Sequence, residues 1–159
     1  MPLLVVRHAN AGRRSAYKGD DRLRPLSTRG HQRAAALVPL LCRYEPESIL
    51  SSPFVRCVET VTPLAESLHL RVKSVDALAE GHGADAVPLL LGMAGDTALL
   101  CTHGDVAVAI LEALVPEPGA ALRSELRLQK GEFWVIESDN DALTIVEHIR
   151  RVRGGSGSQ

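Results

Sequence analysis

Aromatic side chains are scarce in this 159-residue chain, at 3% of its residues, and long apolar runs are absent from it. So few aromatics argue against the base-stacking surfaces of single-stranded nucleic-acid binders. No apolar stretch approaches the roughly 18 residues that a membrane-spanning helix needs. The formal net charge of −1 lacks the basic excess typical of nucleic-acid and membrane-surface binders. We therefore expect neither a nucleic acid nor a membrane as a partner.

Cysteine is also rare, with Cys42, Cys57 and Cys101 widely spaced inside apolar stretches. An odd number of isolated cysteines is unlike the framework of a disulfide-stapled secreted protein, and no C-x-x-C pair indicates zinc or redox chemistry. The first residues carry no basic leader of the kind that opens a signal peptide. These features predict a reduced, cytoplasmic protein.

The length and the hydrophobic content of 45% are those of one ordinary globular domain with a proper core. We expect that domain to span residues 1–151. The last segment, residues 152–159, is rich in glycine and serine and is typical of a flexible tail.

Short apolar segments alternate with longer amphipathic ones along the chain. Ser27 and Ser52 are good N-cap residues for two of the helices. The alternation predicts an α/β protein: a three-layer α/β/α sandwich whose central sheet is mostly parallel, with an antiparallel C-terminal edge hairpin. The expected strands are 3–6, 48–51, 72–75 and 97–102, the helices 28–44, 53–68, 84–92 and 106–115, and the hairpin arms 132–137 and 143–148.

Charged and histidine side chains follow the predicted strands. Arg7 and His8 come directly after the first strand, and His103 comes directly after the fourth. Arg56 lies in the first turn of the helix after the second strand, and Glu80 follows the third strand after a short loop. Because ligands of such folds bind beyond the carboxyl ends of the strands, we expect these side chains to meet there.

Two arginines, two histidines and a carboxylate suit phosphoryl transfer. A phosphoryl group in flight carries negative charge on its equatorial oxygens, and arginine offers a planar, permanently charged fork for them. One ring nitrogen of a histidine can attack phosphorus when the other is held as a donor. A glutamate can protonate the leaving oxygen and then deprotonate water.

Each of these residues also has a structural interpretation. His103 is equally consistent with a strand-ending turn, and Arg56 with a solvated charge on a helix. Glu80 has the weakest case, because loop glutamates are common; Glu59, Asp85 and Asp105 are alternative proton donors. The joint placement, rather than any single residue, favours a phosphate site.

Four segments resemble the motifs of the histidine phosphatase superfamily, the phosphoglycerate-mutase-like proteins, in the family's order. They are Arg7-His8-Ala9-Asn10-Ala11, Arg24-Pro25-Leu26-Ser27 with Arg29-Gly30, Ser51 to Thr60, and Thr102-His103-Gly104-Asp105. The resemblance implies that His8 is the phosphorylated nucleophile and that Arg7, Arg56 and His103 hold phosphate. It also implies that Glu80 is the proton donor and Asn10 an additional phosphate contact.

The small size is similar to that of SixA-type phosphohistidine phosphatases. Details around residues 17–26 and 101–106 resemble the C-terminal phosphatase domain of two-domain MutT-type (Nudix) hydrolases. The implied activity is a metal-independent phosphatase, without cofactor, acting on a phosphorylated small molecule, a nucleotide or a protein phosphohistidine. The loop 11–24, with Arg13, Arg14, Lys18 and Arg22, is expected to rim the pocket.

Three other functions are compatible with the sequence. A non-catalytic module could bind phosphorylated ligands through the same residues. A metal-binding protein would use some of the six histidines, but these form no i,i+4 pair. A mutase would need more chain than this to enclose a bisphosphorylated intermediate.

Overall fold

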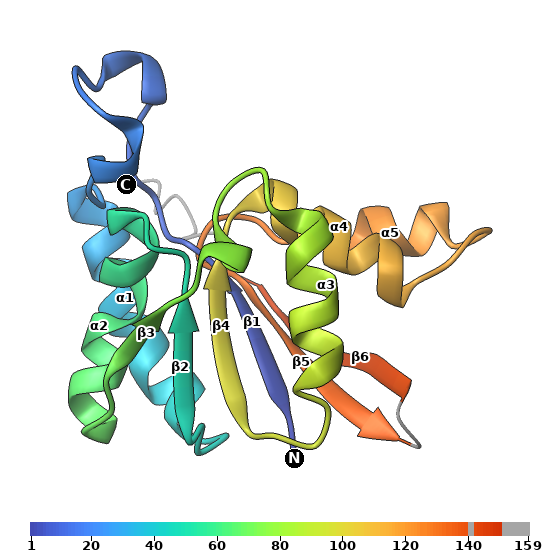
Figure 1. Ribbon diagram of the computed structural model, residues 1–159. Helices are drawn as coiled ribbons and strands as arrows, with labels where there is room; N and C mark the ends of the chain where they lie inside the picture. The colour runs from blue at the N-terminus through green and yellow to red at the C-terminus, as the bar shows by residue number, and fades with distance from the viewer. Residues whose placement is uncertain (140–141, 151–159) are drawn as a thin grey trace, which may run out of the picture.

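A six-stranded mixed sheet forms the centre of the computed structural model, which describes residues 1–139 and 142–150 (Figure 1). The predicted tail at residues 152–159 lies outside the described residues. The strands stand side by side in the order β3-β2-β4-β1-β5-β6. Their bounds are β1 (Leu3–Arg7), β2 (Ser48–Ser51), β3 (Val72–Ser74), β4 (Ala98–Thr102), β5 (Phe133–Asp139) and β6 (Ala142–Ile149).

Strand direction confirms the predicted sheet. The pairs β2–β3, β2–β4 and β1–β4 are parallel, so the carboxyl ends of the first four strands lie at one edge. In the register of the central pair, Arg7 stands opposite Thr102, directly before His8 and His103. β5 runs antiparallel to β1 and forms the predicted edge hairpin with β6.

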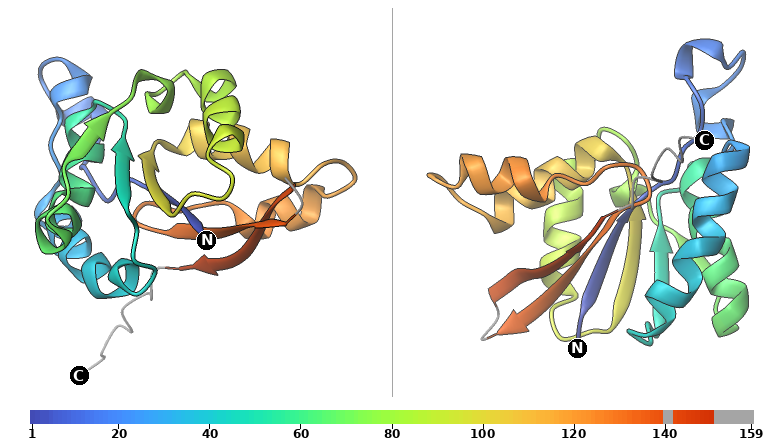
Figure 2. Two further views of the ribbon diagram at one scale, coloured as in Figure 1. Left: turned by 60° about the horizontal axis from the view of Figure 1, so that its bottom comes forward. Right: turned by 180° about the vertical axis from the view of Figure 1, so that it is seen from behind.

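Helices cover both faces of the sheet (Figure 2). The helices α1 and α2 pack on the face that carries Leu4 and Val6 of β1, whereas α3 and α4 pack on the face that carries Leu3 and Val5. Successive side chains of β1 therefore pack against the two helix layers in turn, as expected for a strand covered on both sides. The helix bounds are α1 (Thr28–Cys42), α2 (Val55–Leu68), α3 (Gly83–Gly92), α4 (Gly104–Leu114) and α5 (Ala120–Leu126).

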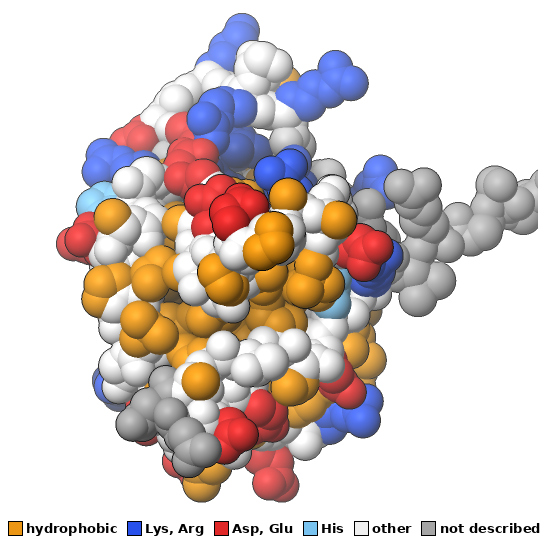
Figure 3. Space-filling view, turned by 90° about the vertical axis from the view of Figure 1, so that its right-hand side faces the viewer, with side chains coloured by type: hydrophobic (Ala, Val, Ile, Leu, Met, Phe, Trp, Pro, Cys, Tyr) orange, Lys and Arg blue, Asp and Glu red, His pale blue; other side chains and the backbone are white. Residues whose placement is uncertain are grey.

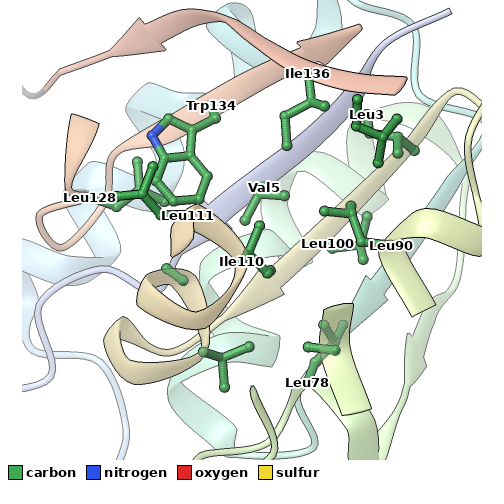
Figure 4. Packing of buried hydrophobic residues seen from close by; sticks show 14 of the residues in the cluster. Leu3, Val5, Leu78, Leu90, Leu100, Ile110, Leu111, Leu128, Trp134 and Ile136 are labelled. Atoms are coloured by element: carbon green, nitrogen blue, oxygen red, sulfur yellow. The ribbon is translucent and has the colours of Figure 1, made fainter. Parts of the chain in front are cut away.

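The face covered by α3 and α4 buries Trp134, the largest of the fully buried side chains. Figure 4 shows Trp134 and Ile136 of β5 beside Val5 of β1, with Ile110 of α4 packed over them. The Trp134 indole N–H donates to the carbonyl of Leu126 at 2.7 Å, which fastens α5 to the sheet. Within the described residues, no helix is both long and apolar enough to cross a membrane.

Two predicted helix starts were wrong, and one helix was missed. α2 begins at Val55 instead of Pro53, because Phe54 has an extended backbone and is the N-cap in place of Ser52. α4 begins at Gly104, two residues earlier than predicted, so His103 is its N-cap. The short helix α5 was not predicted; its seven residues include no fully buried side chain, so they carry little hydrophobic pattern.

Candidate active site

The side chains predicted to meet at the carboxyl edge of the sheet line one cavity of about 810 Å³. Arg7 and His8 reach it from the end of β1, Arg56 from the first turn of α2, and His103 from the N-terminus of α4. Glu80 reaches it from the connection between β3 and α3. The topology thus brings together residues that lie up to 96 positions apart in the chain.

His8 is held in one ring orientation. Its Nδ1 lies 2.8 Å from the Ala9 carbonyl oxygen, an acceptor, so Nδ1 carries the proton and Nε2 keeps its lone pair. Burial lowers the pKa of His8 to about 3, and the neighbouring His103, Arg56 and Arg7 contribute in the same direction. The ring is therefore neutral at physiological pH, which is the state that a nucleophilic histidine needs.

Thr60 connects the His8 segment to α2. Its hydroxyl donates to the carbonyl of Arg56 at 2.6 Å and accepts the backbone N–H of Ala9 at 3.0 Å. One side chain thus fixes the backbone next to His8 against the turn that carries Arg56. This contact gives a structural reason for a threonine four residues after Arg56.

Arg56 is almost fully buried, at 1% exposure. Its Nη1 donates to the Asp21 carbonyl at 2.8 Å, and its Nη2 to the Asp21 carboxylate at 3.1 Å. Phe54 packs against the guanidinium, 4.9 Å from its ring centroid. Among the described residues, Nε of Arg56 has no hydrogen-bond partner. The guanidinium is thus anchored at one end and leaves a buried donor unsatisfied.

His103 is anchored in the same way. Ser52 Oγ accepts the Phe54 N–H at 3.2 Å and lies 2.8 Å from His103 Nε2. The Ser52 hydroxyl can therefore donate to Nε2, which places the ring proton on Nδ1. Nδ1 is buried and has no hydrogen-bond partner in the described part of the chain. The ring lies edge-on to His8, with 5.4 Å between the ring centroids.

Arg7 lies against the first residue of α4. Its Nη1 donates to the Leu128 carbonyl at 2.9 Å, and its buried Nε has no partner among the described residues. Burial, followed by the charge of Arg127, lowers the pKa of Arg7. A Cβ built on Gly104 would stand 2.8 Å from Cζ of Arg7 and 2.9 Å from its Nη2. The absence of a side chain at Gly104 thus makes room for the guanidinium.

Replacement of Gly104 by Ala is expected to displace Arg7 and lower kcat/KM for an aryl phosphate by about 10²-fold, the cost of misplacing a group in contact with the reacting phosphate. The fold should survive, because alanine favours a helix more than glycine does. Steady-state kinetics and thermal unfolding measure both effects. Gly92→Ala is the control, since a Cβ there meets nothing within 4 Å. Unchanged kinetics of Gly104→Ala would contradict the proposed place of Arg7.

Glu80 lines the cavity in an ion pair with Arg14, at 2.5 Å, and lies 3.6 Å from Nη2 of Arg56. Of the alternative carboxylates, Asp105 also lines the cavity, but its Oδ2 accepts the backbone N–H of Gly81 at 2.8 Å. Glu59 and Asp85 do not line it: Glu59 accepts from the backbone of Leu26 and Asp85 bonds His82. Of the four carboxylates, Glu80 and Asp105 therefore line the cavity, and the role of Glu80 as the proton donor stays a prediction.

Asn10 does not line the cavity. Its Oδ1 accepts from the Ser27 hydroxyl at 2.7 Å and from the Gly12 N–H at 3.1 Å. Ser27 is the N-cap of α1, as predicted, and its Oγ accepts the N–H of Gly30. A Cβ on Gly30 would lie 2.0 Å from the Asn10 carbonyl oxygen, so only glycine fits where α1 meets this loop. These contacts give Asn10 a structural role; its predicted contact with phosphate stays a prediction.

Positive charge dominates the lining. Two carboxylates, Glu80 and Asp105, face seven cationic side chains: Arg7, Arg13, Arg14, Arg24, Arg56, Arg127 and Lys130. Arg13 and Arg14 come from the loop 11–24, which projects above the sheet edge and carries the Lys and Arg side chains at the top of Figure 3. Lys18 and Arg22 of that loop do not line the cavity. The site is thus strongly suited to an anion.

Some residues of the site were missed in the sequence. Ser52 and Thr60 lie inside a recognised motif, but nothing in their spacing indicated contacts with His103 and Ala9. Arg24 is buried because it donates to the carbonyls of Ala11 and Gly12 and to Asp21, which holds the loop together. Arg127 belongs to a stretch without periodicity, and only the fold brings it beside Arg7.

Comparison with known proteins identifies the family of this chain. Residues 3–86 match the family model of the histidine phosphatase superfamily (branch 1). The chain is 36% identical over 154 residues to the 8-oxo-(d)GTP phosphatase of Mycolicibacterium smegmatis. That alignment covers 92% of this chain and 47% of the relative, so the chain spans about half the length of that protein.

Solved structures share the fold. A candidate phosphohistidine phosphatase SixA from Agrobacterium tumefaciens superposes with a TM-score of 0.79 at 23% identity, covering 94% of this chain and 97% of the other. The protein histidine phosphatase SixA complexed with tungstate superposes with a TM-score of 0.76 at 19% identity, covering 94% and 97%. At these identities the likeness concerns the fold, which is the phosphoglycerate-mutase-like one predicted from the sequence.

Proposed function

Because the chain belongs to the histidine phosphatase superfamily (branch 1), we propose that it hydrolyses phosphate esters by transferring the phosphoryl group first to His8 and then to water. Nε2 of His8 attacks phosphorus, an N–P bond forms, and the P–O bond to the leaving group breaks. Glu80 gives its proton to the leaving oxygen. Water then attacks phosphorus, Glu80 accepts a proton from it, and the N–P bond breaks to release inorganic phosphate.

The observation that carries this proposal is the state of His8. The imidazole is neutral, its Nδ1 is bonded to a carbonyl, and its Nε2 keeps a lone pair in a cavity lined by cations. Such a ring is a prepared nucleophile, whereas a protonated ring could only bind phosphate.

Other residues of the cavity can stabilise the negative charge of the phosphoryl group. The unsatisfied donors, Nε of Arg7, Nε of Arg56 and Nδ1 of His103, are buried in the same site. The equatorial phosphoryl oxygens would accept hydrogen bonds from all three donors. These hydrogen bonds would be strongest in the transition state. We propose that these donors do the charge neutralisation that Mg²⁺ does in other phosphoryl-transfer enzymes, and that a chelator leaves the activity unchanged.

We propose a nucleotide as the substrate class, ahead of other phosphorylated small molecules and of protein phosphohistidine. The name of the Mycolicibacterium smegmatis relative supports this choice, since the match covers nearly all of this chain. The width of the cavity is consistent with it, because about 810 Å³ is within the range of pockets for molecules much larger than phosphate. Parallel assays with nucleotides, sugar phosphates and a phosphohistidine carrier protein test the ranking.

The proposed mechanism is tested by trapping the intermediate. After rapid mixing with substrate and an alkaline quench, the protein is expected to carry a phosphoryl group that is stable to base, labile to acid and located on His8 by peptide mass spectrometry. A non-catalytic phosphate-binding module would bind tungstate but would form no phosphoenzyme and no product. Turnover without label on His8 would overturn the mechanism.

A further inference from the structure

The cavity holds more positive charge than one phosphoryl group uses. Arg7, Arg56, His8 and His103 surround the position proposed for that group. Of the remaining cations, Arg24 is bonded to backbone carbonyls and to Asp21, and Arg14 is paired with Glu80. Arg13 and Arg127 differ from these, because within residues 1–139 and 142–150 neither guanidinium has a hydrogen bond or ion pair. Arg13 lies on the projecting loop 11–24, whereas Arg127 is next to Leu128, which binds Arg7.

Arg127 is attached close to the phosphate pocket. It is the C-cap residue of α5 and the neighbour of Leu128, whose carbonyl accepts from Arg7 at 2.9 Å. Lys130 follows on the same segment and lines the same cavity. The next residue, Gly131, donates its N–H to the carbonyls of Arg7 and His8, both at 3.1 Å. The segment 127–131 is therefore fastened to the catalytic strand at both ends.

The charge of Arg127 acts on the phosphate pocket. Its charge is one of the causes that lower the pKa of Arg7, so the two guanidiniums repel each other in the unliganded protein. Like charges held together in a cavity create a positive potential that attracts and stabilises an anion there. Arg127 also borders two smaller pockets beside this cavity, but among the described residues no side chain is bonded to its guanidinium in either of them.

We infer that Arg127, assisted by Lys130, forms a second anion subsite that binds the phosphoryl group next to the one attacked by His8, so that the preferred substrate contains two linked phosphoryl groups, as in a nucleoside diphosphate or triphosphate. This inference rests on the proposed function and adds to it a residue that determines specificity. The terminal phosphoryl group occupies the pocket of Arg7 and Arg56. The adjacent one lies at the rim, within reach of the guanidinium of Arg127, which suits phosphate oxygens.

Equilibrium binding tests the subsite without turnover. The probes are methylenediphosphonate, whose P–C–P bridge resists hydrolysis, and orthophosphate, each titrated calorimetrically. We expect the native chain to bind the diphosphonate at least about tenfold more tightly than orthophosphate, the gain from one further charge-assisted contact. In Arg127→Gln this ratio should fall to about threefold or less, with the Kd for orthophosphate almost unchanged.

Arg71→Gln is the matched control: it removes the same charge from an exposed position directly before β3, away from the cavity lining. It should keep the ratio of the native chain. The inference is overturned if the native chain does not prefer the diphosphonate, if the diphosphonate does not bind, or if Arg127→Gln weakens both probes equally. Because binding is measured, failure of phosphoryl transfer to His8 would leave this result valid, and failure here would leave the phosphoenzyme test valid.

Discussion

The variant His8→Asn is expected to lose catalysis by about 10⁴-fold or more in kcat, the scale on which removal of a nucleophile acts. Asparagine retains a side-chain N–H that can donate to the Ala9 carbonyl, but it has no nucleophilic nitrogen. The donors of Arg7, Arg56 and His103 stay in place. The Kd for orthophosphate should therefore change by less than about threefold, well under 1.4 kcal/mol. Rapid-quench kinetics and calorimetry separate the two quantities.

The same variant should resist acid better than the native protein. Unfolded His8 binds a proton near pH 6.5, whereas the folded residue stays neutral down to about pH 3. Between these values the unfolded state binds more protons, so the native free energy of unfolding falls as the pH falls, by up to about 1.4 kcal/mol per pH unit from this group. His8→Asn removes that contribution. Urea denaturation at pH 7 and pH 5 measures it; equal pH dependence in both proteins would show that His8 is protonated in the fold.

Substitution of Arg56 by Ala is expected to lower kcat/KM by about 10²–10³-fold, the effect of losing a positioned donor to the transition state in a buried site. It also leaves the backbone carbonyl and the carboxylate of Asp21 without the donors at 2.8 and 3.1 Å, which loosens the loop that rims the cavity. Arg56→Lys should recover only part of the activity, because one ammonium group cannot hold Asp21 and phosphate with the geometry of a guanidinium.

A suitable control lies in the same loop. Arg22 forms an ion pair with Asp20 at 2.7 Å, but both side chains are exposed and neither lines the cavity. Arg22→Ala removes an arginine–aspartate contact without touching the site, so it should leave kcat/KM unchanged. Equal losses in Arg22→Ala and Arg56→Ala would mean that the loop, and not contact with phosphate, accounts for the effect of Arg56.

The fold was predictable because its signals are local. The apolar run Leu3–Val6 predicted a strand buried on both faces, and 97–102 a further apolar strand. The rule that ligands bind beyond the carboxyl ends of the strands predicted that Arg7, His8 and His103 would meet at one edge. The strand pairing bears this out. Helix starts were less predictable, since Ser52 is a good capping residue by type but binds His103 instead.

The parts of the site that could not be predicted depend on contacts between distant segments. Burial of Arg24 comes from carbonyls that turn toward it only in the folded loop. The pairing of Glu80 with Arg14 joins residues 66 positions apart. Arg127 follows a short helix with little apolar pattern, so neither periodicity nor a motif assigns it to the cavity. Nothing in the local sequence distinguishes such residues from surface residues. Their contacts are determined by the segments that the fold places beside them.

The antiparallel direction of β5 indicates which residues could be changed to alter the substrate preference of the protein. An antiparallel strand brings its beginning, not its end, to the edge where the parallel strands finish. The segment that precedes β5 therefore reaches the mouth of the cavity without contributing to the nucleophile or to the pocket of Arg56. Exchanging the side chains of Arg127, Gln129 and Lys130, while keeping the buried Leu128 and Gly131 in place, offers a way to redirect substrate choice and leave the phosphoryl-transfer chemistry intact.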